Sequence, residues 1–519
     1  MNIQEAKEEI IRTVRAYLAK DEDGSYLIPR ERQRPVLLMG APGIGKTAVM
    51  RQIAEELGIS LVSYTITHHT RQSAIGLPVV SEKRYGGKRC SVTEYTMSEI
   101  VASVYEQIER SKIAEGILFL DEINCVSETL APTMLQFLQY KRFGTHEVPA
   151  GYVIVTAGNP PEYNKSVRDF DIVTLDRVRR LDVREDFPVW KKYALRQGIH
   201  GAVLSYLEIK KDRFYSVRAA AGGTRFVTAR GWEDLSDSLK VYERLGLSVE
   251  REFAASFLQD PEIAEDFSIY YELYRKYRTQ YRIPELLRGE RPENAGQLKD
   301  APFDEKLSLI GLLVSALGQE FQRWALELSV QRELFEILKT VRDMLSRGEL
   351  REGSNAERKA GSTAPELRGQ CIYLKDWLEA TLRARRAQLK EREEAQLLGR
   401  EEAQRERGLL LRLQELCGEM LRERRADYSF LKQRFAISEE ERRAREQETD
   451  RHLTNVFRFL AETFGEQQEL VLFLSELDAG YYSLRFVQET GNEAYYRYNR
   501  ILLLKDRREE LKEEVMRLL

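Results

Sequence analysis

"GAPGIGKT", residues 40–47, is the stretch that decides how the first part of this 519-residue chain folds. The apolar run "PVLLM" (35–39) precedes it and an amphipathic pattern over 46–57 follows it, so it joins an expected strand to an expected helix. It fits the pattern G-x-x-x-x-G-K-[ST], in which glycines let backbone N–H groups turn toward phosphates. We therefore expect it to hold nucleotide phosphates at the positive end of the helix dipole.

Two side chains of this loop have specific expected roles. Lys46 is expected to reach the β- and γ-phosphates, and Thr47 to place its hydroxyl on Mg²⁺. The alternative is a chance match, and the flanking strand and helix patterns argue against it. The predicted ATP-binding loop comprises Gly40, Ala41, Pro42, Gly43, Ile44, Gly45, Lys46, Thr47 and Ala48.

A second motif, "GILFLDEIN" (116–124), places two carboxylates at the end of an apolar strand. Asp121 is suited to the Mg²⁺ shell at the nucleotide, and Glu122 to polarising an attacking water. Two acidic residues that merely cap the next helix are the alternative. That alternative does not explain why a buried strand delivers them beside a phosphate loop, so the pair favours hydrolysis over simple nucleotide binding.

Three further polar residues follow in order. Asn159 ends another apolar strand, and its amide is able to orient the lytic water next to Glu122. Arg177 leads into a fifth strand, and Arg230 opens a helix.

The first half alternates apolar runs with helical patterns, which favours a parallel α/β sheet. Residues 187–282 lose the strand signal and are expected to be helical. We predict an α/β core over 1–186, a helical lid over 187–282, a linker over 283–303 and a helical C-terminal domain over 304–519. The expected strands cover 35–39, 60–67, 116–120, 151–157 and 178–183, with helices over 46–57, 97–112 and 127–140.

The C-terminal domain is expected to contain long charged helices. A second break, residues 346–366, is expected to be an exposed loop. Over 380–450 a long solvated helix with one buried stripe is favoured over a strict coiled coil, because the second heptad positions are mostly charged. The stripe comprises Leu382, Leu389, Ala403, Leu410 and Cys417.

Taken in this order, the motifs resemble an AAA+ ATPase. "GAPGIGKT" matches Walker A, "ILFLDE" matches Walker B, and Asn159 stands at the sensor 1 position. Arg177 resembles the arginine finger and Arg230 the sensor 2 arginine. The resemblance implies a five-stranded sheet of order 5-1-4-3-2, a helical lid, and ATP bound between subunits of a ring, usually a hexamer.

Finer features resemble the MoxR branch of this family. "AIGLPVV" (74–80) lies where that branch carries an insert, and residues 139–164 resemble its hairpin before sensor 1. The segment 81–92 is either a hairpin whose Tyr85 grips a substrate chain in the ring's channel or an ordinary surface hairpin. The MoxR resemblance implies a chaperone-like activator whose partner is often a von Willebrand factor A domain protein.

The arginine finger departs from the MoxR pattern, which usually reads "LDRF". Here Val178 follows Arg177, and Arg179 and Arg180 are close by. Arg177 is the first candidate and Arg180 its rival as a catalytic residue. A basic strand edge that pairs with acidic residues is the alternative for each.

Three functions therefore compete: a remodeller of a protein partner, a nucleic-acid motor, and a nucleotide-gated scaffold with little turnover. The basic clusters at 383–390 and 422–425 are interleaved with acidic runs, which favours a solvated helix face over nucleic-acid binding. Glu122 and Asn159 argue against the scaffold.

The composition narrows these choices. The net charge of −3 gives no global sign of a nucleic-acid binder. No stretch approaches the roughly 20 consecutive apolar residues of a membrane span, and the N-terminus lacks a signal-peptide core. The four cysteines have no paired metal spacing, and the adjacent His68 and His69 are a poor metal site. We expect a reduced, cytoplasmic protein.

Overall fold

The computed structural model describes residues 1–66, 76–127, 130–163, 170, 172–220, 223–292, 297–353, 372–394, 398–465 and 467–501. The chain divides into two compact units. The first unit comprises Met1–Val189, Thr228–Arg230 and Lys390–Gly399. The second unit comprises Trp190–Val227, Gly231–Leu389 and Arg400–Leu519.

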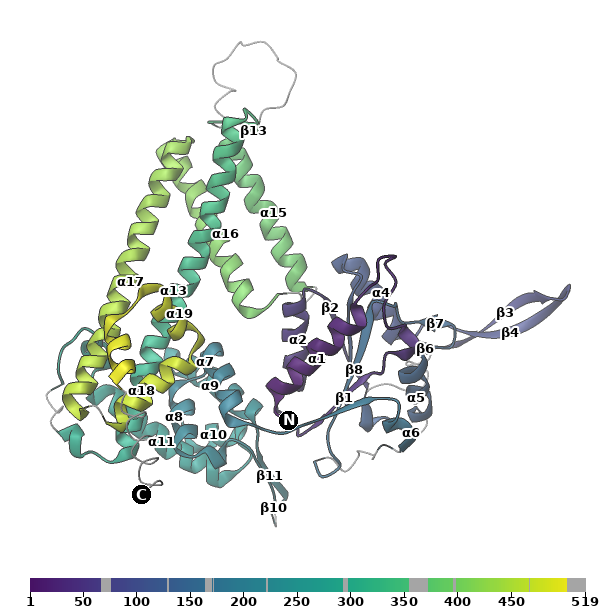
Figure 1. The fold of residues 1–519 in the computed structure, drawn as a ribbon, viewed down its shortest axis with the longest axis horizontal. Coiled ribbons are helices and arrows are strands. Elements are labelled where there is room, and N and C mark those ends of the chain that lie inside the picture. The colour runs from purple at the N-terminus through teal and green to yellow at the C-terminus, as the bar shows by residue number, and fades with distance from the viewer. Residues whose placement is uncertain are drawn as a thin grey trace, which may run out of the picture. The chain divides into compact units, whose positions relative to one another are not determined.

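A five-stranded parallel sheet forms the centre of the first unit (Figure 1). Its strand order is β2-β5-β8-β1-β9, which reads 5-1-4-3-2 from β9 when the five strands are numbered along the chain. Every residue of β1 and β8 is buried, as expected for central strands of a parallel sheet covered on both faces. The strands are β1 (Val36–Gly40), β2 (Ser60–Thr65), β5 (Gly116–Asp121), β8 (Tyr152–Gly158) and β9 (Arg179–Val183).

Helices of the first unit cover the sheet, whose carboxyl edge carries the predicted functional side chains (Figure 1). Because the strands are parallel, the carboxyl ends of β1, β5 and β8 meet at one edge. α2 begins directly at Lys46, one residue after Gly45. The helical elements are α1 (Ile3–Leu18), α2 (Lys46–Leu57), α4 (Glu99–Ser111), α5 (Ala131–Tyr140) and α6 (Ile172–Leu175), with short 3₁₀ turns η1 (Arg30–Arg32) and η3 (Ile123–Cys125).

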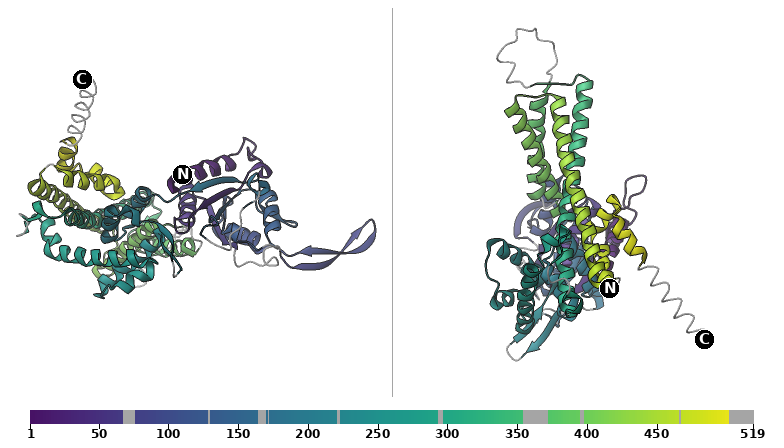
Figure 2. Two further views of the ribbon diagram at one scale, coloured as in Figure 1. Left: turned by 90° about the horizontal axis from the view of Figure 1, so that it is seen from below. Right: turned by 90° about the vertical axis from the view of Figure 1, so that its left-hand side faces the viewer.

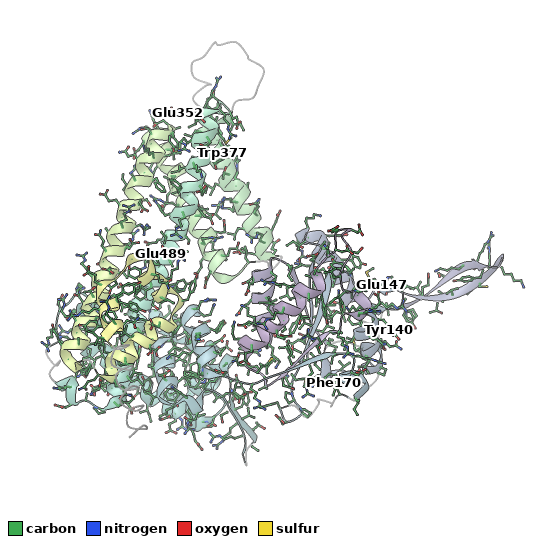
Figure 3. All side chains as sticks on the ribbon, in the orientation of Figure 1. Tyr140, Glu147, Phe170, Glu352, Trp377 and Glu489 are labelled. Atoms are coloured by element: carbon green, nitrogen blue, oxygen red, sulfur yellow. The ribbon has the colours of Figure 1, made fainter. Side chains whose placement is uncertain are left out.

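Two hairpins extend the first unit. β3 (Pro78–Tyr85) and β4 (Lys88–Tyr95) pair antiparallel and project from the rest of the unit as a two-stranded ribbon (Figure 1). Gly86 and Gly87 form its turn, and both have positive φ, as such tight turns require. The short hairpin β6 (Arg142–Phe143) and β7 (His146–Glu147) meets the ribbon's base, where His146 Nε2 lies 3.0 Å from the Tyr95 carbonyl (Glu147 is labelled in Figure 3).

The first part of the second unit is mostly helical, but the expectation of helices alone over 187–282 is wrong. β10 (Ser216–Ala220) and β11 (Gly223–Val227) form an antiparallel hairpin there. A cluster of buried aromatic rings, including Tyr206, Trp232 and Phe267, holds the helices together. The helical elements are α7 (Phe187–Gln197), α8 (Gly201–Ile209), η4 (Lys211–Arg213), α9 (Ala229–Leu245), α10 (Arg251–Phe257) and α11 (Pro261–Gln280), of which α7 and α9 begin in the first unit.

The expected linker over 283–303 contains ordered helix. Pro284 lies in the first turn of α12 (Ile283–Leu287), where its missing N–H costs no hydrogen bond. η5 (Gln297–Asp300) follows, and Pro302 is the N-cap of the next helix. Residues 293–296 lie outside the described residues.

Long helices make up the rest of the second unit, and α13, α16 and α17 pack against one another (Figure 2). The prediction of one long helix over 380–450 is wrong. The helix Arg400–Glu423 is followed by Arg424 with φ 52°, and the Asp427 side chain accepts from the Phe430 N–H to cap a new helix that begins at Tyr428. The buried stripe is confirmed at Leu389, Ala403, Leu410 and Cys417. The elements are α13 (Phe303–Ser346), β12 (Leu350–Arg351), β13 (Ile372–Tyr373), α15 (Leu374–Glu394), α16 (Arg400–Glu423), α17 (Tyr428–Phe464), α18 (Gln468–Ala479) and α19 (Tyr481–Thr490).

Most of the expected loop at 346–366 lies outside the described residues, because the structure does not describe residues 354–371. None of the helices that the structure describes combines the length and the apolar character needed to cross a bilayer.

Candidate nucleotide site

The loop over residues 40–47 turns because its glycines adopt conformations that side chains disfavour. Gly43 has φ 73° and Gly45 has φ 94°, both in the left-handed region. A Cβ on Gly40 would lie 2.7 Å from the Val183 carbonyl of β9, and one on Gly43 would lie 2.8 Å from Thr228. Ala41 and Ile44 are buried beneath the loop, Pro42 is half-buried, and Ala48 is exposed on α2.

Lys46 is buried, and the acceptors that hold its amine among the described residues are all neutral. Its Nζ donates to the carbonyls of Gly40 (2.8 Å) and Ala41 (2.9 Å) and to Oδ1 of Asn159 (2.8 Å). Burial lowers the pKa of Lys46 to about 8; the Asp121 charge opposes this shift and the Arg230 charge adds to it. A buried amine without a direct anionic partner is a site that an incoming phosphate can stabilise.

Thr47 and Asp121 come together from different elements. The Thr47 hydroxyl donates to Oδ2 of Asp121 across 2.9 Å, between the start of α2 and the end of β5. Hydroxyl and carboxylate oxygens suit Mg²⁺, which takes few protein ligands and keeps several waters. The residues present therefore fit the magnesium ion that the two motifs imply.

Glu122 leaves β5 through a strained turn. Its φ of 57° lies in the left-handed region, which residues other than glycine rarely adopt. Its backbone N–H donates to Oδ1 of Asp121 (2.9 Å). Such strain costs about 1–3 kcal/mol and is typical of functional sites. The chain thus maintains an unfavourable backbone at the residue that the sequence predicts to be the base.

Asn159 lies directly beyond the end of β8 and joins this cluster through Lys46. Its backbone is held by Asn124, whose Nδ2 donates to the Asn159 carbonyl (2.7 Å) and whose Oδ1 accepts from the Asn159 N–H (3.3 Å). The sequence motifs indicate Asn159 but not Asn124. No pattern in the sequence sets Asn124 apart from the other residues that follow Asp121.

Arg230 lies near the loop on the first turn of α9. Its backbone N–H donates to the Gly43 carbonyl (3.3 Å), and its exposed side chain is close enough to lower the pKa of Lys46. Thr228, two residues earlier, packs against Gly43, a contact that no sequence motif indicated.

The candidate finger residues Arg177 and Arg180, and Arg179 between them, lie at the opposite edge of the sheet. Arg179 is paired with Val36 and Arg180 with Leu37, at the start of β1, whereas the loop follows the end of β1. At about 3.3 Å per residue, the three residues from Leu37 to Gly40 span roughly 10 Å. These arginines are therefore not part of the cluster around Lys46.

Their side chains differ in what they contact. Arg179 donates to Thr13 Oγ1 (2.7 Å) and Glu9 Oε1 (2.6 Å) of α1, and Arg180 donates to Asp182 Oδ1 (2.8 Å). The half-buried side chain of Arg177 has no hydrogen-bond or ion-pair partner among the described residues. The basic-edge interpretation thus fits Arg179 and Arg180 better than Arg177.

Tyr85, another candidate from the sequence, lies away from this cluster. Tyr85 is 56% exposed at the end of the β3–β4 ribbon. His68 and His69 lie outside the described residues, as do residues 74–75 of the "AIGLPVV" segment.

One part of the chain, which contains most of this cluster, is similar to a known family. Residues 36–175 match the family model described as "ATPase family associated with various cellular activities (AAA)". A search of curated proteins gave no match. The matched segment contains the loop, Asp121, Glu122 and Asn159, while Arg177 and Arg230 lie outside it. The chain therefore carries an AAA ATPase domain built on a parallel five-stranded sheet, and this domain implies a nucleotide-binding ATPase.

Proposed function

We propose that this protein is a MoxR-like AAA+ ATPase that hydrolyses ATP within a ring, most simply a hexamer, to remodel or activate a protein partner. The observation that carries the proposal is the clustering of Lys46, Asp121 and Asn159 at one sheet edge. Arg177 lies at the other edge and has no side-chain partner among the described residues.

In the proposed reaction, backbone N–H groups of the loop and the Lys46 amine bind the ATP phosphates. Thr47 and Asp121 would hold Mg²⁺, which neutralises phosphate charge when bound. Glu122 accepts a proton from the attacking water, and Asn159 orients that water. The Asn159 Oδ1 already faces Lys46, so its Nδ2 is the atom that can donate to water or to the γ-phosphate.

The position of the arginines supports a shared site. Arg177 precedes β9 at the sheet edge away from the loop, so it can serve a neighbouring subunit's nucleotide more readily than its own. Arg230 on α9, whose N–H donates to the Gly43 carbonyl, would sense the γ-phosphate of its own subunit. Loss of that phosphate would then be passed to the helices that follow Arg230.

The β3–β4 ribbon supports a protein partner. It is exposed along both strands, and an isolated two-stranded ribbon is at best marginally stable, so a partner segment can pair with its free edges. Its exposed apolar residues include Val79, Val80 and Tyr85. A von Willebrand factor A domain protein is the partner class that the MoxR resemblance suggests.

The whole proposal is tested by measuring phosphate release and mass of the purified full chain. We expect the specific ATPase activity to rise with protein concentration as rings form, and Lys46→Ala to remove it. Pull-downs from cell extract with ATP should recover a protein that a variant lacking residues 81–92 does not recover. Activity that is independent of assembly would contradict the ring, and strong stimulation by DNA or RNA would favour the nucleic-acid motor.

Nucleotide affinity is expected to depend on pH through Lys46. Anionic phosphates favour the charged amine, so binding raises a pKa that is about 8 in the free protein. The affinity should therefore stay level from pH 7 to about 8 and fall as pH rises further, because a proton must then be taken up on binding. A fluorescent nucleotide titration checks this. Lys46→Arg, which stays charged throughout, should bind without that decline.

A further inference from the structure

Asn124 makes a two-point contact with the backbone of Asn159. It lies in the turn η3, two residues after Glu122, and is 4% exposed. Its Nδ2 donates to the Asn159 carbonyl at 2.7 Å, and its Oδ1 accepts from the Asn159 N–H at 3.3 Å. A carbonyl can only accept and an N–H can only donate, so this pair fixes the orientation of the Asn124 amide.

The contact replaces the strand pairing that ends at this point. β8 stops at Gly158, which is the last residue paired with β1, through Met39. The N–H and carbonyl of the next residue, Asn159, would have no ladder partner, and Asn124 satisfies both. The fit is close, because a Cβ on Gly158 would lie 2.7 Å from Asn124 Oδ1.

The same turn carries the candidate base. Glu122 precedes Asn124 by two residues, and the Cys125 N–H donates to the Glu122 carbonyl (2.9 Å) to close η3. On the other side of the contact, Asn159 Oδ1 accepts from Lys46 Nζ. Asn124 therefore joins the turn that holds Glu122 to the residue that contacts Lys46.

We propose that Asn124 is a positioning residue for hydrolysis: it holds Asn159 in place relative to Glu122 and Lys46, without itself contacting the nucleotide. This inference rests on the proposed ATPase function and adds a residue to it. A small displacement of a catalytic group is enough to reduce the rate strongly, since reacting groups must be held within a fraction of an ångström.

The test is the kinetics of Asn124→Leu, which keeps the side-chain size and removes both hydrogen bonds. We expect kcat to fall about 10–100-fold with little change in nucleotide affinity. The double variant with Asn159→Ala should lose no more than Asn159→Ala alone, because both changes remove the same function. A purely structural role for Asn124 would not give this coupling.

A matched control separates positioning from general destabilisation. Asn492 is also buried, at 2% exposed, and its Oδ1 accepts from the Tyr495 N–H while its Nδ2 donates to Asp450. Asn492→Leu should lower the thermal unfolding midpoint without lowering kcat at a temperature where the variant is folded. If Asn492→Leu lowers kcat as Asn124→Leu does, the loss reflects destabilisation and the inference is wrong.

The two levels of the proposal fail in distinguishable ways. A wild-type chain that does not hydrolyse ATP overturns the proposed function. A wild-type chain that hydrolyses ATP, together with a folded Asn124→Leu variant of equal kcat, overturns only the role of Asn124. Losses from Asn124→Leu and Asn159→Ala that simply add would also overturn it.

Discussion

Replacing Glu122 by glutamine is expected to reduce ATP hydrolysis by about 10²–10⁴-fold while ATP binding is kept. The amide has nearly the same shape but cannot accept a proton from the attacking water. The left-handed backbone at Glu122 supports this role, because the chain maintains an unfavourable conformation at that residue beside Asp121. Phosphate release and the binding of a fluorescent ATP analogue measure the two quantities separately.

Glu115→Gln is the matched control for this variant. This substitution makes the same change of carboxylate to amide at the other end of β5, where Glu115 pairs with Lys20 at 2.6 Å. We expect that variant to hydrolyse ATP at the wild-type rate. Wild-type turnover in Glu122→Gln would remove Glu122 as the base, and equal loss in both variants would point to a general effect of lost charge.

The glycine loop and the strand ends were predictable because short apolar runs and fixed spacings report local structure. The predicted helix over 46–57 matches α2 in the structure, since Gly45 and Gly58 with positive φ mark both of its ends. The β10–β11 hairpin was not predictable from the same signal. Its strands "SVRAA" and "GTRFV" are short and mix apolar with polar residues, and cross-strand pairing rather than a long hydrophobic pattern forms them.

Side-chain contacts between segments far apart in the chain could not be predicted from the sequence either. Nothing in "DEIN" indicates that Asn124 reaches a residue 35 positions further along, because that contact depends on β5 and β8 being neighbours. For the same reason, the sequence alone does not distinguish the roles of the three arginines near β9. Only the packing of α1 against the sheet gives Arg179 its partners Glu9 and Thr13.

Arg177→Ala is expected to reduce ATP hydrolysis by about 10³–10⁵-fold if Arg177 is the arginine finger. Its guanidinium would stabilise charge that develops on the γ-phosphoryl oxygens of a neighbouring subunit. Arg180→Ala should have a small effect, because the exposed side chain of Arg180 is already paired with Asp182. Arg179→Ala should lower stability through lost contacts with α1 and should affect the rate less than Arg177→Ala does.

Mixing two inactive variants tests whether the site is shared. In a ring that contains Arg177→Ala and Glu122→Gln chains, some interfaces combine the intact Glu122 of the first with the intact Arg177 of the second. We therefore expect ATPase activity to reappear on mixing, at a level that depends on the ratio of the two chains. An arginine that acts within its own subunit cannot be supplied in this way, because every chain then lacks either its base or its arginine. If the mixture stays inactive although mixed assemblies form, Arg177 does not act across the interface; if Arg180→Ala, and not Arg177→Ala, shows the loss and the recovery, the finger is Arg180.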